Sequence, residues 1–473
     1  VSDRRFETPT DQSVTVAVLA AGQGKRMISD LPKPLHLVAG IPIVERVIRA
    51  GLAIEPQRLV AVVNPDVLDL PERIGLDGQF DAIVQSYPYG TAGAVRSALD
   101  HLPPSRWLIS LLGDSPLLTG DTVQLLIDGA RERGSKISIL TCLLDDAGPY
   151  GRIERDTQGN VQRIVELKAD DPAKRLGAAE INSGIMVLDA EWARQALKRL
   201  EPNPHSGELF LTDILDLAVA EHVDGDPWPI ETVVANSDVA LGINDRVQLA
   251  DAEAVIRRNT RSRLMRAGVT LIAPETIVID EMVEIAPDTT ILPFSVITGR
   301  TTIGRKCQIG PHAVLHNATI ADGVELRSST VTESSVGPGT RVGPYAHLRG
   351  NTRVGPNVHV GTAAEMKNTV VGDGSHVAHF SYLGDTTIGS HTNIGAGTIS
   401  ANYDGTHKHP TTIGDNVFIG SDSVLIAPVT VSDGARTGAG SVVNRSVAAG
   451  ATVVGVPARP IATRRKSQTR TEE

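Results

Sequence analysis

The sequence predicts an α/β domain followed by a parallel β-helix, with a single helix between them. Short apolar segments alternate with helix-like segments over about residues 12–245, and residues 245–266 contain neither glycine nor proline. From about Glu284 onward an aliphatic residue recurs every six positions, which is the period of a parallel β-helix with three short strands per coil. Composition agrees, because 24 of the 45 glycines follow Glu284 and aromatic residues make up only 3% of the chain.

The first domain is expected to consist of βαβ units. Residues 14–22 read VTVAVLAAG, an apolar run ending in glycine, as a buried parallel strand does. Further strand candidates are Leu59–Asn64, Trp107–Leu112, Ile137–Leu143 and Gly184–Val187. Helix-like stretches lie between or after them, at Ile43–Ala53, Gly90–Leu102, Thr122–Gly134 and Trp192–Leu200. This alternation predicts a parallel sheet.

The domain boundaries follow from changes in composition. Residues 245–266 have helix-forming composition and many charges, which predicts a solvated connecting helix. We therefore expect a first domain at 1–245, a linker helix at 246–267 and a β-helix domain at 268–463. The polar end of the chain, 464–473, is expected to be disordered.

The six-residue period predicts which side chains fill the β-helix. The recurring aliphatics are Ile285, Ile291, Ile297, Ile303, Ile309 and Leu315, then Val342, Leu348, Val354, Val360 and Met366, and then Ile413, Ile419, Leu425 and Val431. Glycine often follows the aliphatic residue, and we expect it to permit the corner conformation. A polar segment between Ile394 and Ile413 interrupts the period. It predicts a protruding loop, and such loops in solenoids usually lie on the binding face.

Charge and cysteine content exclude several classes of protein. A net charge of −10 argues against a nucleic-acid binder, which needs a basic surface. The two cysteines lie far apart, so neither a disulfide framework nor a zinc site is expected, and the count suits a reducing cytosol. Because no uncharged apolar run reaches 18 residues, no membrane span is expected. The polar N-terminal residues have no signal-like apolar segment, so secretion is not expected.

A glycine-containing loop follows the first strand. Residues 19–27 read LAAGQGKRM, in which small residues let backbone N–H groups approach an anion and Arg26 can pair with a phosphate. The glycine spacing alone is equally compatible with a plain strand-to-helix turn, since it matches neither a dinucleotide fingerprint nor a Walker motif. A second motif, LLGDSPLL at 111–118, places Asp114 at the end of a hydrophobic strand, where ligands of open α/β sheets collect.

These motifs resemble a known family. LAAGQGKRM followed by LPKPLH, and LLGDSPLL, resemble the signature of sugar-nucleotide pyrophosphorylases. With the six-residue repeats, residues 14–460 resemble the bacterial bifunctional N-acetylglucosamine-1-phosphate uridyltransferase/glucosamine-1-phosphate acetyltransferases. The resemblance implies a Rossmann-like nucleotidyltransferase domain, a left-handed β-helix whose hand the repeat alone does not fix, and a cytoplasmic homotrimer with sites between subunits. It also implies the substrates UTP, a sugar 1-phosphate and acetyl-CoA.

The resemblance assigns roles in the first domain. Arg26 and Lys33 would stabilise triphosphate charge, and Mg²⁺ would be held by Asp114 and Asn244, which suits a cation that takes oxygen ligands and keeps several waters. Positions implied to hold the nucleotide, with Lys33 and Asp114, are Leu19, Ala20, Ala21, Gly22, Gln85, Gly90, Thr91 and Gly113. Positions implied to hold the acetamido sugar are Gly151, Glu166 and Asn182.

It also assigns roles in the repeat domain. His379, in HFSYLGD, would be the general base, although nine of the thirteen histidines lie beyond residue 310 and most are expected to be plain surface residues. Arg349 and Lys367 would bind the sugar phosphate, and their spacing of 18 residues places them on the same side of neighbouring coils. Further implied contacts to the sugar are Tyr382 and Asn393, and those to acetyl-CoA are Ala396, Asn402, Tyr403, Ser421 and Ala439.

The chain departs from the family pattern at Lys25, Leu112, Ala92 and Gly455. At Gly455 a cation for the CoA phosphates is missing, and Lys408 and Arg459 are candidates to replace it. Two alternative functions therefore stay open: a related transferase that uses another nucleotide or amino sugar, and a non-catalytic subunit of the same architecture. The presence of Asp114 and His379 favours an enzyme.

Overall fold

The computed structural model describes residues 12–87, 90–148, 150–166, 177–203, 207–240 and 242–461. They form two compact units, Val1–Ile256 and Arg257–Glu473, which divide within helix α7 (Arg246–Arg266). The segment 464–473, for which we expected disorder, lies outside the described residues. Each unit has its own hydrophobic core and is described by itself.

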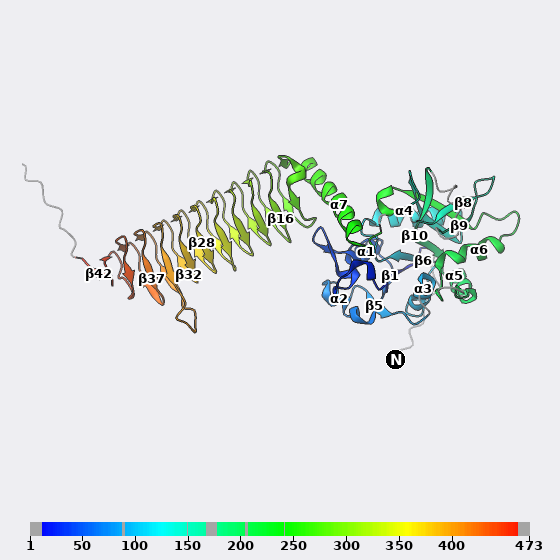
Figure 1. Ribbon diagram of the computed structural model, residues 1–473, viewed down its shortest axis with the longest axis horizontal. Helices are drawn as coiled ribbons and strands as arrows, with labels where there is room; N and C mark the ends of the chain where they lie inside the picture. The colour runs from blue at the N-terminus through cyan, green and yellow to red at the C-terminus, as the bar shows by residue number, and fades with distance from the viewer. Residues whose placement is uncertain are drawn as a thin grey trace, which may run out of the picture. The chain divides into compact units, whose positions relative to one another are not determined.

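The N-terminal unit is built on one large sheet (Figure 1). Its central strands run in the order β11–β7–β10–β6–β1–β4–β5, and a β8–β9 hairpin pairs with β10. The strands are β1 (Val14–Ala20), β4 (Arg58–Val63), β5 (Asp81–Val84), β6 (Trp107–Leu112), β7 (Ile137–Leu144), β8 (Arg152–Arg155), β9 (Val161–Val165), β10 (Ala179–Asp189) and β11 (Ile230–Ala235). The five strands predicted from the sequence are confirmed, to within a few residues at their ends.

Six α-helices accompany the sheet in this part of the described chain. They are α1 (Ile43–Leu52), α2 (Leu70–Arg73), α3 (Thr91–Leu99), α4 (Gly120–Arg133), α5 (Ala190–Ala196) and α6 (Ile214–Ala220). Of these, α1, α3, α4 and α5 lie where the alternating pattern predicted helices, whereas α2 and α6 were not predicted. Helix α4 shows why such a segment begins and ends where it does: the Thr119 hydroxyl accepts from Thr122 N at 3.3 Å, and Gly134 ends the helix in a left-handed conformation. Along β1, alternate residues enter separate core clusters, Val16 and Val18 in one and Ala17 in the other.

The predicted parallel sheet is confirmed for the pairing of β1 with β4 and β6, of β4 with β5 and of β7 with β11, but it is wrong at β10. Strand β10, which contains the predicted Gly184–Val187, runs antiparallel to both β6 and β7. Parallel neighbours need a crossover connection that returns the chain to the same end of the sheet. Between β7 and β10 the chain forms the β8–β9 hairpin instead, so β10 enters from the opposite end.

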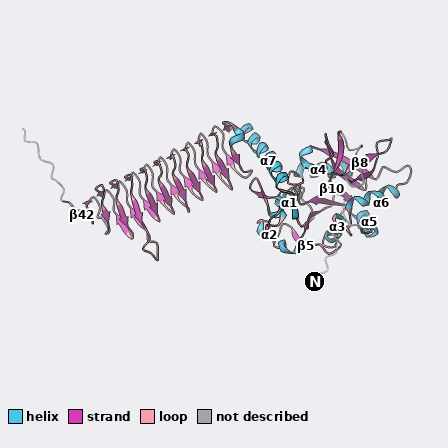
Figure 2. Ribbon diagram, viewed as in Figure 1, coloured by secondary structure: helices cyan, strands magenta, loops and turns pink. Residues whose placement is uncertain are grey.

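The second unit is a parallel β-helix of two- and three-residue strands (Figure 2). Three sheets form its faces. One has 12 strands and begins at β12 (Thr270–Leu271), another has 10 and begins at β13 (Val278–Ile279), and the third has 9 and begins at β14 (Glu284–Ile285). The predicted hexad aliphatics all lie in its buried core, so this part of the prediction is confirmed.

The predicted reason for the glycines is wrong at many positions. At Gly304, Gly395 and Gly420 the backbone has no positive φ; instead, an added Cβ would lie 2.5 Å from Ser421 N at Gly395 and 2.6 Å from Ala439 N at Gly420. Glycine is needed there because successive coils approach closely. Left-handed corners are occupied largely by other residues, for example Lys306 and His312.

The polar interruption forms a small hairpin that projects from the coils between β34 (Ile399–Ala401) and β35 (Thr411–Ile413), as predicted (Figure 1). An antiparallel bridge joins Tyr403 and Lys408, and His409 N donates to Asn402 O at 2.7 Å. Asp404 holds the turn, because its side chain accepts from the backbone of Thr406 and His407.

Within the described part of the chain, no helix has both the length and the apolar character needed to cross a membrane.

Candidate active sites

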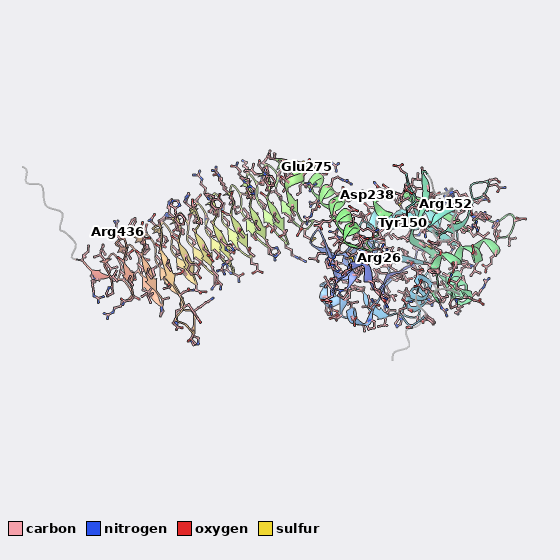
Figure 3. All side chains as sticks on the ribbon, in the orientation of Figure 1. Arg26, Tyr150, Arg152, Asp238, Glu275 and Arg436 are labelled. Atoms are coloured by element: carbon pink, nitrogen blue, oxygen red, sulfur yellow. The ribbon has the colours of Figure 1, made fainter. Side chains whose placement is uncertain are left out.

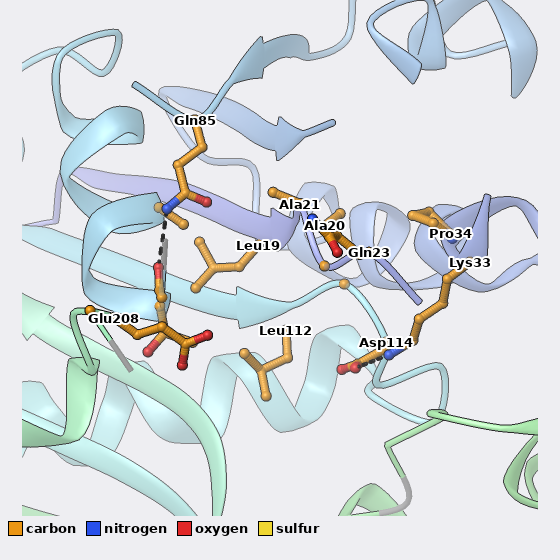
Figure 4. A pocket seen from close by; sticks show the side chains of 16 residues that line it. Leu19, Ala20, Ala21, Gln23, Lys33, Pro34, Gln85, Leu112, Asp114 and Glu208 are labelled. Atoms are coloured by element: carbon orange, nitrogen blue, oxygen red, sulfur yellow. Dashed lines mark hydrogen bonds and ion pairs between the residues drawn. The ribbon is translucent and has the colours of Figure 1, made fainter. Parts of the chain in front are cut away.

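A pocket of about 760 Å³ opens where β1 and β6 end (Figure 4). The predicted nucleotide residues that line it are Leu19, Ala20, Ala21, Gly22, Lys33, Gln85, Gly90, Thr91, Gly113 and Asp114. Two strand ends approach closely here, since Gly113 N donates to Leu19 O at 2.9 Å and an added Cβ at Gly113 would lie 2.8 Å from that of Ala20. Glycine at 113 is therefore required for the pocket floor.

Lys33 lies between the two predicted metal ligands. Its Nζ donates to Asp114 Oδ2 at 2.6 Å and to Asn244 Oδ1 at 3.2 Å. The ammonium is mostly buried, with 12% of the side chain exposed. A carboxylate and an amide oxygen thus converge on one cation, although Asn244 is 211 residues away from Lys33 in the chain.

Arg26 is not among the residues that line the pocket. It lies in the short 3-10 helix Lys25–Met27, and its side chain is exposed (Figure 3). The loop from Gly24 to Lys33 closes tightly, because a Cβ at Gly24 would lie 2.6 Å from Lys33 Cβ. Of the two predicted phosphate-binding cations, the structure therefore brings only Lys33 into the pocket wall.

Gln85, Gly90 and Thr91, which the resemblance implies would read the base of the nucleotide, are held by a distant segment. Gln85 Nε2 donates to Gly90 O at 3.3 Å, Ala92 N donates to Leu209 O at 3.0 Å, and Leu211 N donates to the Thr91 hydroxyl at 2.9 Å. Gly90 has φ +116, and an added Cβ there would lie 2.2 Å from Leu209 O. The contact with residues 209–211 accounts for the glycine at this position.

Glu208, which the sequence reasoning missed, also lines the pocket. Figure 4 shows Gln85 and Glu208 toward one end of the pocket and Lys33 with Asp114 toward the other. The pocket therefore has a polar end at Gln85 and Glu208 and, at the other end, the ion pair of Lys33 with Asp114. No sequence motif indicates Glu208. It reaches the pocket because its neighbour Leu209 contacts the start of α3.

The three residues predicted to hold the sugar lie together beside this pocket. Asn182 N donates to Gly151 O at 2.8 Å, and a Cβ at Gly151 would lie 3.0 Å from Glu166 Oε1. Leu112, which lines the pocket, packs against Gly184, whose N–H donates to Asn182 Oδ1 at 2.9 Å. The cluster thus adjoins the pocket wall through Leu112.

Tyr150 is a second residue that the sequence reasoning missed, although it is adjacent to Gly151. Burial and the nearby Asp114 carboxylate raise the pKa of Tyr150, while a hydrogen bond with the Gly242 backbone opposes them. The raised pKa keeps the phenol of Tyr150 protonated, and Figure 3 marks its place in the unit.

In the β-helix, the predicted phosphate-binding cations lie on one face. Arg349 in β25 (His347–Arg349) is in register with Lys367 in β28 (Glu365–Lys367), as the spacing predicted. Arg349 donates to Glu365 Oε1 from Nη2 at 2.6 Å and from Nε at 3.0 Å. Lys408 of the hairpin lowers the pKa of Lys367 through a hydrogen bond and its positive charge, to which Arg349 adds.

Lys408 thus lies beside Lys367, on the face that carries the predicted phosphate-binding cations Arg349 and Lys367, rather than at the C-terminal coils near Gly455. Two further residues of the implied site adjoin this face. Tyr382, in β31 (Tyr382–Gly384), is in register with Glu365. Asn402 donates to Asp385 Oδ2 at 2.6 Å, and an added Cβ at Gly384 would lie 2.7 Å from both the Asn402 amide nitrogen and the Tyr382 hydroxyl.

The predicted base and several predicted acetyl-CoA contacts form one column at a corner of the β-helix. Backbone hydrogen bonds join successive coils at this corner: Gly397 N donates to His379 O at 2.9 Å, Asp422 N to Ala396 O at 2.7 Å, and Gly440 N to Ser421 O at 2.8 Å. The column therefore runs through His379, Ala396, Ser421 and Ala439. His379 is exposed, and its Nδ1 accepts from Thr362 N at 3.1 Å.

Asn393 and Tyr403 lie apart from this column. Asn393, in β33 (Asn393–Ile394), is in register with His376 on the 12-stranded sheet. Tyr403 is 60% exposed on the hairpin, and its hydroxyl donates to Gly405 O at 2.6 Å.

Among the described residues, no cluster of three or more His, Cys, Asp or Glu side chains has the arrangement of a metal site.

Two family models match the chain. The MobA-like NTP transferase domain matches residues 16–176, and the bacterial transferase hexapeptide (six repeats) matches residues 282–317 and 410–445. The hexapeptide match and the three stacked parallel sheets support the left-handed β-helix that the resemblance implied.

Relatives match over nearly the whole chain. "Bifunctional protein GlmU" of Exiguobacterium sibiricum is 41% identical over 91% of this chain and 94% of its own. Proteins of the same name from Corynebacterium glutamicum and Nostoc sp. are each 41% identical, over 94% and 92% of this chain and 92% and 94% of their own. Among solved structures, HddC from Yersinia pseudotuberculosis shares 21% identity over 51% of this chain and 98% of its own, with a TM-score of 0.39, from which we draw nothing.

Proposed function

The chain belongs to the GlmU family of bifunctional bacterial transferases, and from this membership we propose that it makes UDP-N-acetylglucosamine in two steps. It acetylates glucosamine 1-phosphate with acetyl-CoA, and it transfers UMP from UTP to N-acetylglucosamine 1-phosphate with release of pyrophosphate. The observation that carries the proposal is that Lys33, in the pocket wall with Asp114, bonds both Asp114 and Asn244, in a chain whose other unit stacks the predicted acetyl-transfer residues.

For the uridylyl step, an oxygen of the sugar phosphate attacks the α-phosphorus of UTP. The protein must align two anions and neutralise their charge, because little covalent chemistry remains for side chains. Lys33 supplies positive charge inside the pocket, and the backbone of residues 19–22 holds the nucleotide. Arg26 must approach from the exposed loop to contribute. Gly151, Glu166 and Asn182 hold the sugar beside Leu112.

Asp114 and Asn244 fit Mg²⁺. Their oxygens already converge on one cation, the Lys33 ammonium, and carboxylate and amide oxygens are ligands that magnesium accepts. When bound, the metal would neutralise phosphate charge. Asp114 would then share its carboxylate between the metal and Lys33.

For the acetyl step, the sugar amine attacks the thioester carbonyl and CoA leaves as its thiol. His379 removes the amine proton, and Arg349 and Lys367 hold the sugar phosphate, with Tyr382 and Asn393 on the sugar. While Nδ1 accepts from Thr362 N, the neutral ring carries its proton on Nε2 and has no free lone pair. His379 must therefore turn out of this bond to act as a base. The hairpin residues Asn402 and Tyr403, together with Ala396, Ser421 and Ala439, contact acetyl-CoA.

We assign the two steps to residues 1–245 and 268–463, with 246–267 as the linker helix. We further propose a cytoplasmic homotrimer, as the family resemblance implies. Exposed apolar side chains on the β-helix support assembly, among them Phe380, next to His379, at 71% and Tyr403, on the hairpin, at 60%. Sedimentation equilibrium tests the trimer, and a monomeric, fully active protein would exclude it.

A second candidate is a related transferase with a different nucleotide or sugar. Leu112, one of the departures from the family pattern, lines the pocket, and Ala92 stands at the start of α3 beside the base-reading residues. A panel of nucleoside triphosphates and sugar 1-phosphates decides between them, and preference for a triphosphate other than UTP would favour this candidate.

The direct test is mass spectrometry of products after incubation with glucosamine 1-phosphate, acetyl-CoA, UTP and Mg²⁺. We expect UDP-N-acetylglucosamine, with N-acetylglucosamine 1-phosphate alone when UTP is omitted. Omitting acetyl-CoA should block the route unless N-acetylglucosamine 1-phosphate is supplied. Absence of both products in a folded protein would reject the proposal.

A further inference from the structure

Arg246, the first residue of α7, holds the loop that carries Arg26 and Lys33. Its Nε donates to Met27 O at 3.3 Å, and its Nη1 lies 3.2 Å from His36 Nδ1. Met27 and His36 stand at the two ends of the segment that contains Lys33, 219 and 210 residues away from Arg246 in the chain. A single guanidinium therefore ties both ends of this segment to α7.

His36 extends this connection into the middle of the loop. Its ring is buried, with 4% exposed, and its Nε2 lies 3.1 Å from Leu31 O. A carbonyl can only accept, so Nε2 carries the proton and Nδ1 is left to accept from Arg246. Burial and the Arg246 charge lower the pKa of His36, in agreement with this neutral form.

The geometry links these bonds to Lys33. Lys33 lies between Leu31 and His36 in the chain, and His36 N donates to Lys33 O at 3.3 Å. Asn244, two residues before Arg246, accepts from Lys33 Nζ. The short segment from Asn244 to Arg246 thus contacts both the amine of Lys33 and the loop backbone on either side of Lys33. A small apolar cluster packs the same elements together: Met27, Val38, Ala39, Ile43, Ile243, Ala252 and Ile256.

We propose that Arg246 and His36 are positioning residues for uridylyl transfer, which act by holding the Lys33 loop against Asp114 and Asn244. The assignment rests on the proposed function. Arg246 and His36 act through Lys33, the group that faces the phosphates. Loss of the connection leaves the pocket intact and lets the Lys33 ammonium move, and displacement of a charged group by about 1 Å can cost on the order of 100-fold in rate.

The test compares Arg246→Ala, Arg246→Lys and the control Arg266→Ala, an exposed arginine at the other end of the same helix. For Arg246→Ala we expect the kcat of uridylyl transfer to fall roughly 10- to 100-fold, with KM for UTP nearly unchanged. Acetyl transfer by the same preparation should be unaffected, which reports correct folding of the other unit. Arg246→Lys should recover part of the loss, since lysine can donate to one of the two acceptors, and Arg266→Ala should match the parent.

His36→Phe provides an independent check, because phenylalanine keeps the ring and removes both polar contacts. If both residues act through one connection, the double variant should be no slower than the worse single variant, whereas independent effects would multiply. A kcat within about twofold of the parent for Arg246→Ala, a rise in KM alone, or equal loss of both activities would overturn the proposal.

A measurement without substrate separates this proposal from the proposed function. Lysine acylation followed by mass spectrometry should label Lys33 slowly in the parent, where 12% of its side chain is exposed, and several-fold faster in Arg246→Ala. Unchanged labelling overturns the positioning role. If the parent transfers no UMP while the labelling differs as expected, the proposed function fails and the structural connection stands.

Discussion

The two units reach a functional site by different routes. In the β-helix, residues about one coil apart lie next to one another, so Arg349 meets Lys367 and His379 lines up with Ala396 and Ser421. In the N-terminal unit, Lys33 meets Asp114 and Asn244 across 81 and 211 residues of chain. A repeat thus encodes its site by spacing, whereas the sheet encodes its site by long-range topology, and each should respond differently to substitution.

The largest expected effect separates the two sites. Asp114→Ala should lower uridylyl transfer by roughly 10²–10³-fold through loss of charge stabilisation, and His379→Ala should lower acetyl transfer by roughly 10²–10⁴-fold through loss of the base. Each variant should retain the other activity in paired assays of one preparation. His376→Ala, an exposed histidine on the same coil, is the control. Loss of both activities in either folded variant would contradict the division into two sites.

Core substitutions should separate the stabilities of the two units. Leu348 is fully buried between Val331 and Met366, its partners in the coils on either side. Leu348→Ala should destabilise the β-helix by about 2–5 kcal/mol and leave the N-terminal unit unchanged. Calorimetry with both activities followed during heating checks this. Val314→Ala, on an outward-facing position that is 40% exposed, should change stability by less than about 0.5 kcal/mol. A matching drop in the transition of the N-terminal unit would show that the units unfold together.

Close packing between coils gives the next test. Gly420→Ala should cost roughly 1–3 kcal/mol, because the added methyl group would lie 2.6 Å from the backbone nitrogen of Ala439. The control is Gly440→Asn, at a corner with φ +68 and no heavy atom within 4 Å of an added Cβ. Asparagine tolerates this conformation and already occupies other corners, such as Asn357 and Asn416. Equal destabilisation by both changes in urea unfolding would contradict the role assigned to close packing between coils at Gly420.

The same contrast explains what could be predicted from the sequence. Every predicted hexad aliphatic is buried because an inward position recurs in each coil. The direction of β10 was mispredicted because it depends on the β8–β9 hairpin, which a local apolar pattern does not reveal. Glu208 and Lys408 reach their sites through tertiary contacts. Glu208 was not identified from the sequence. Lys408 was considered as a cation for the CoA phosphates, whereas it lies beside Lys367, which is predicted to bind the sugar phosphate.

The smallest effect concerns a charged cluster that joins distant segments of the N-terminal unit. Glu221 accepts from Trp192 Nε1 at 2.7 Å, from Arg199 and from Lys136 at 3.3 Å. These hydrogen bonds, Trp192 first, lower the pKa of Glu221 to about 2. Because the folded pKa lies below the unfolded one, the stabilisation is present above about pH 4.5 and is lost as the pH falls through about 2.

Glu221→Gln should therefore cost about 1 kcal/mol at pH 7, a modest value because 29% of the side chain is exposed and solvent screens its charge. In urea unfolding of the N-terminal unit, the difference in free energy of unfolding between parent and variant should narrow as the pH falls from 7 to 3. Glu201→Gln, at an exposed position, should show no such pH dependence. If this difference in free energy of unfolding does not change with pH, the cluster stabilises the unit through packing and neutral hydrogen bonds. The charge of Glu221 would then contribute nothing to joining these segments.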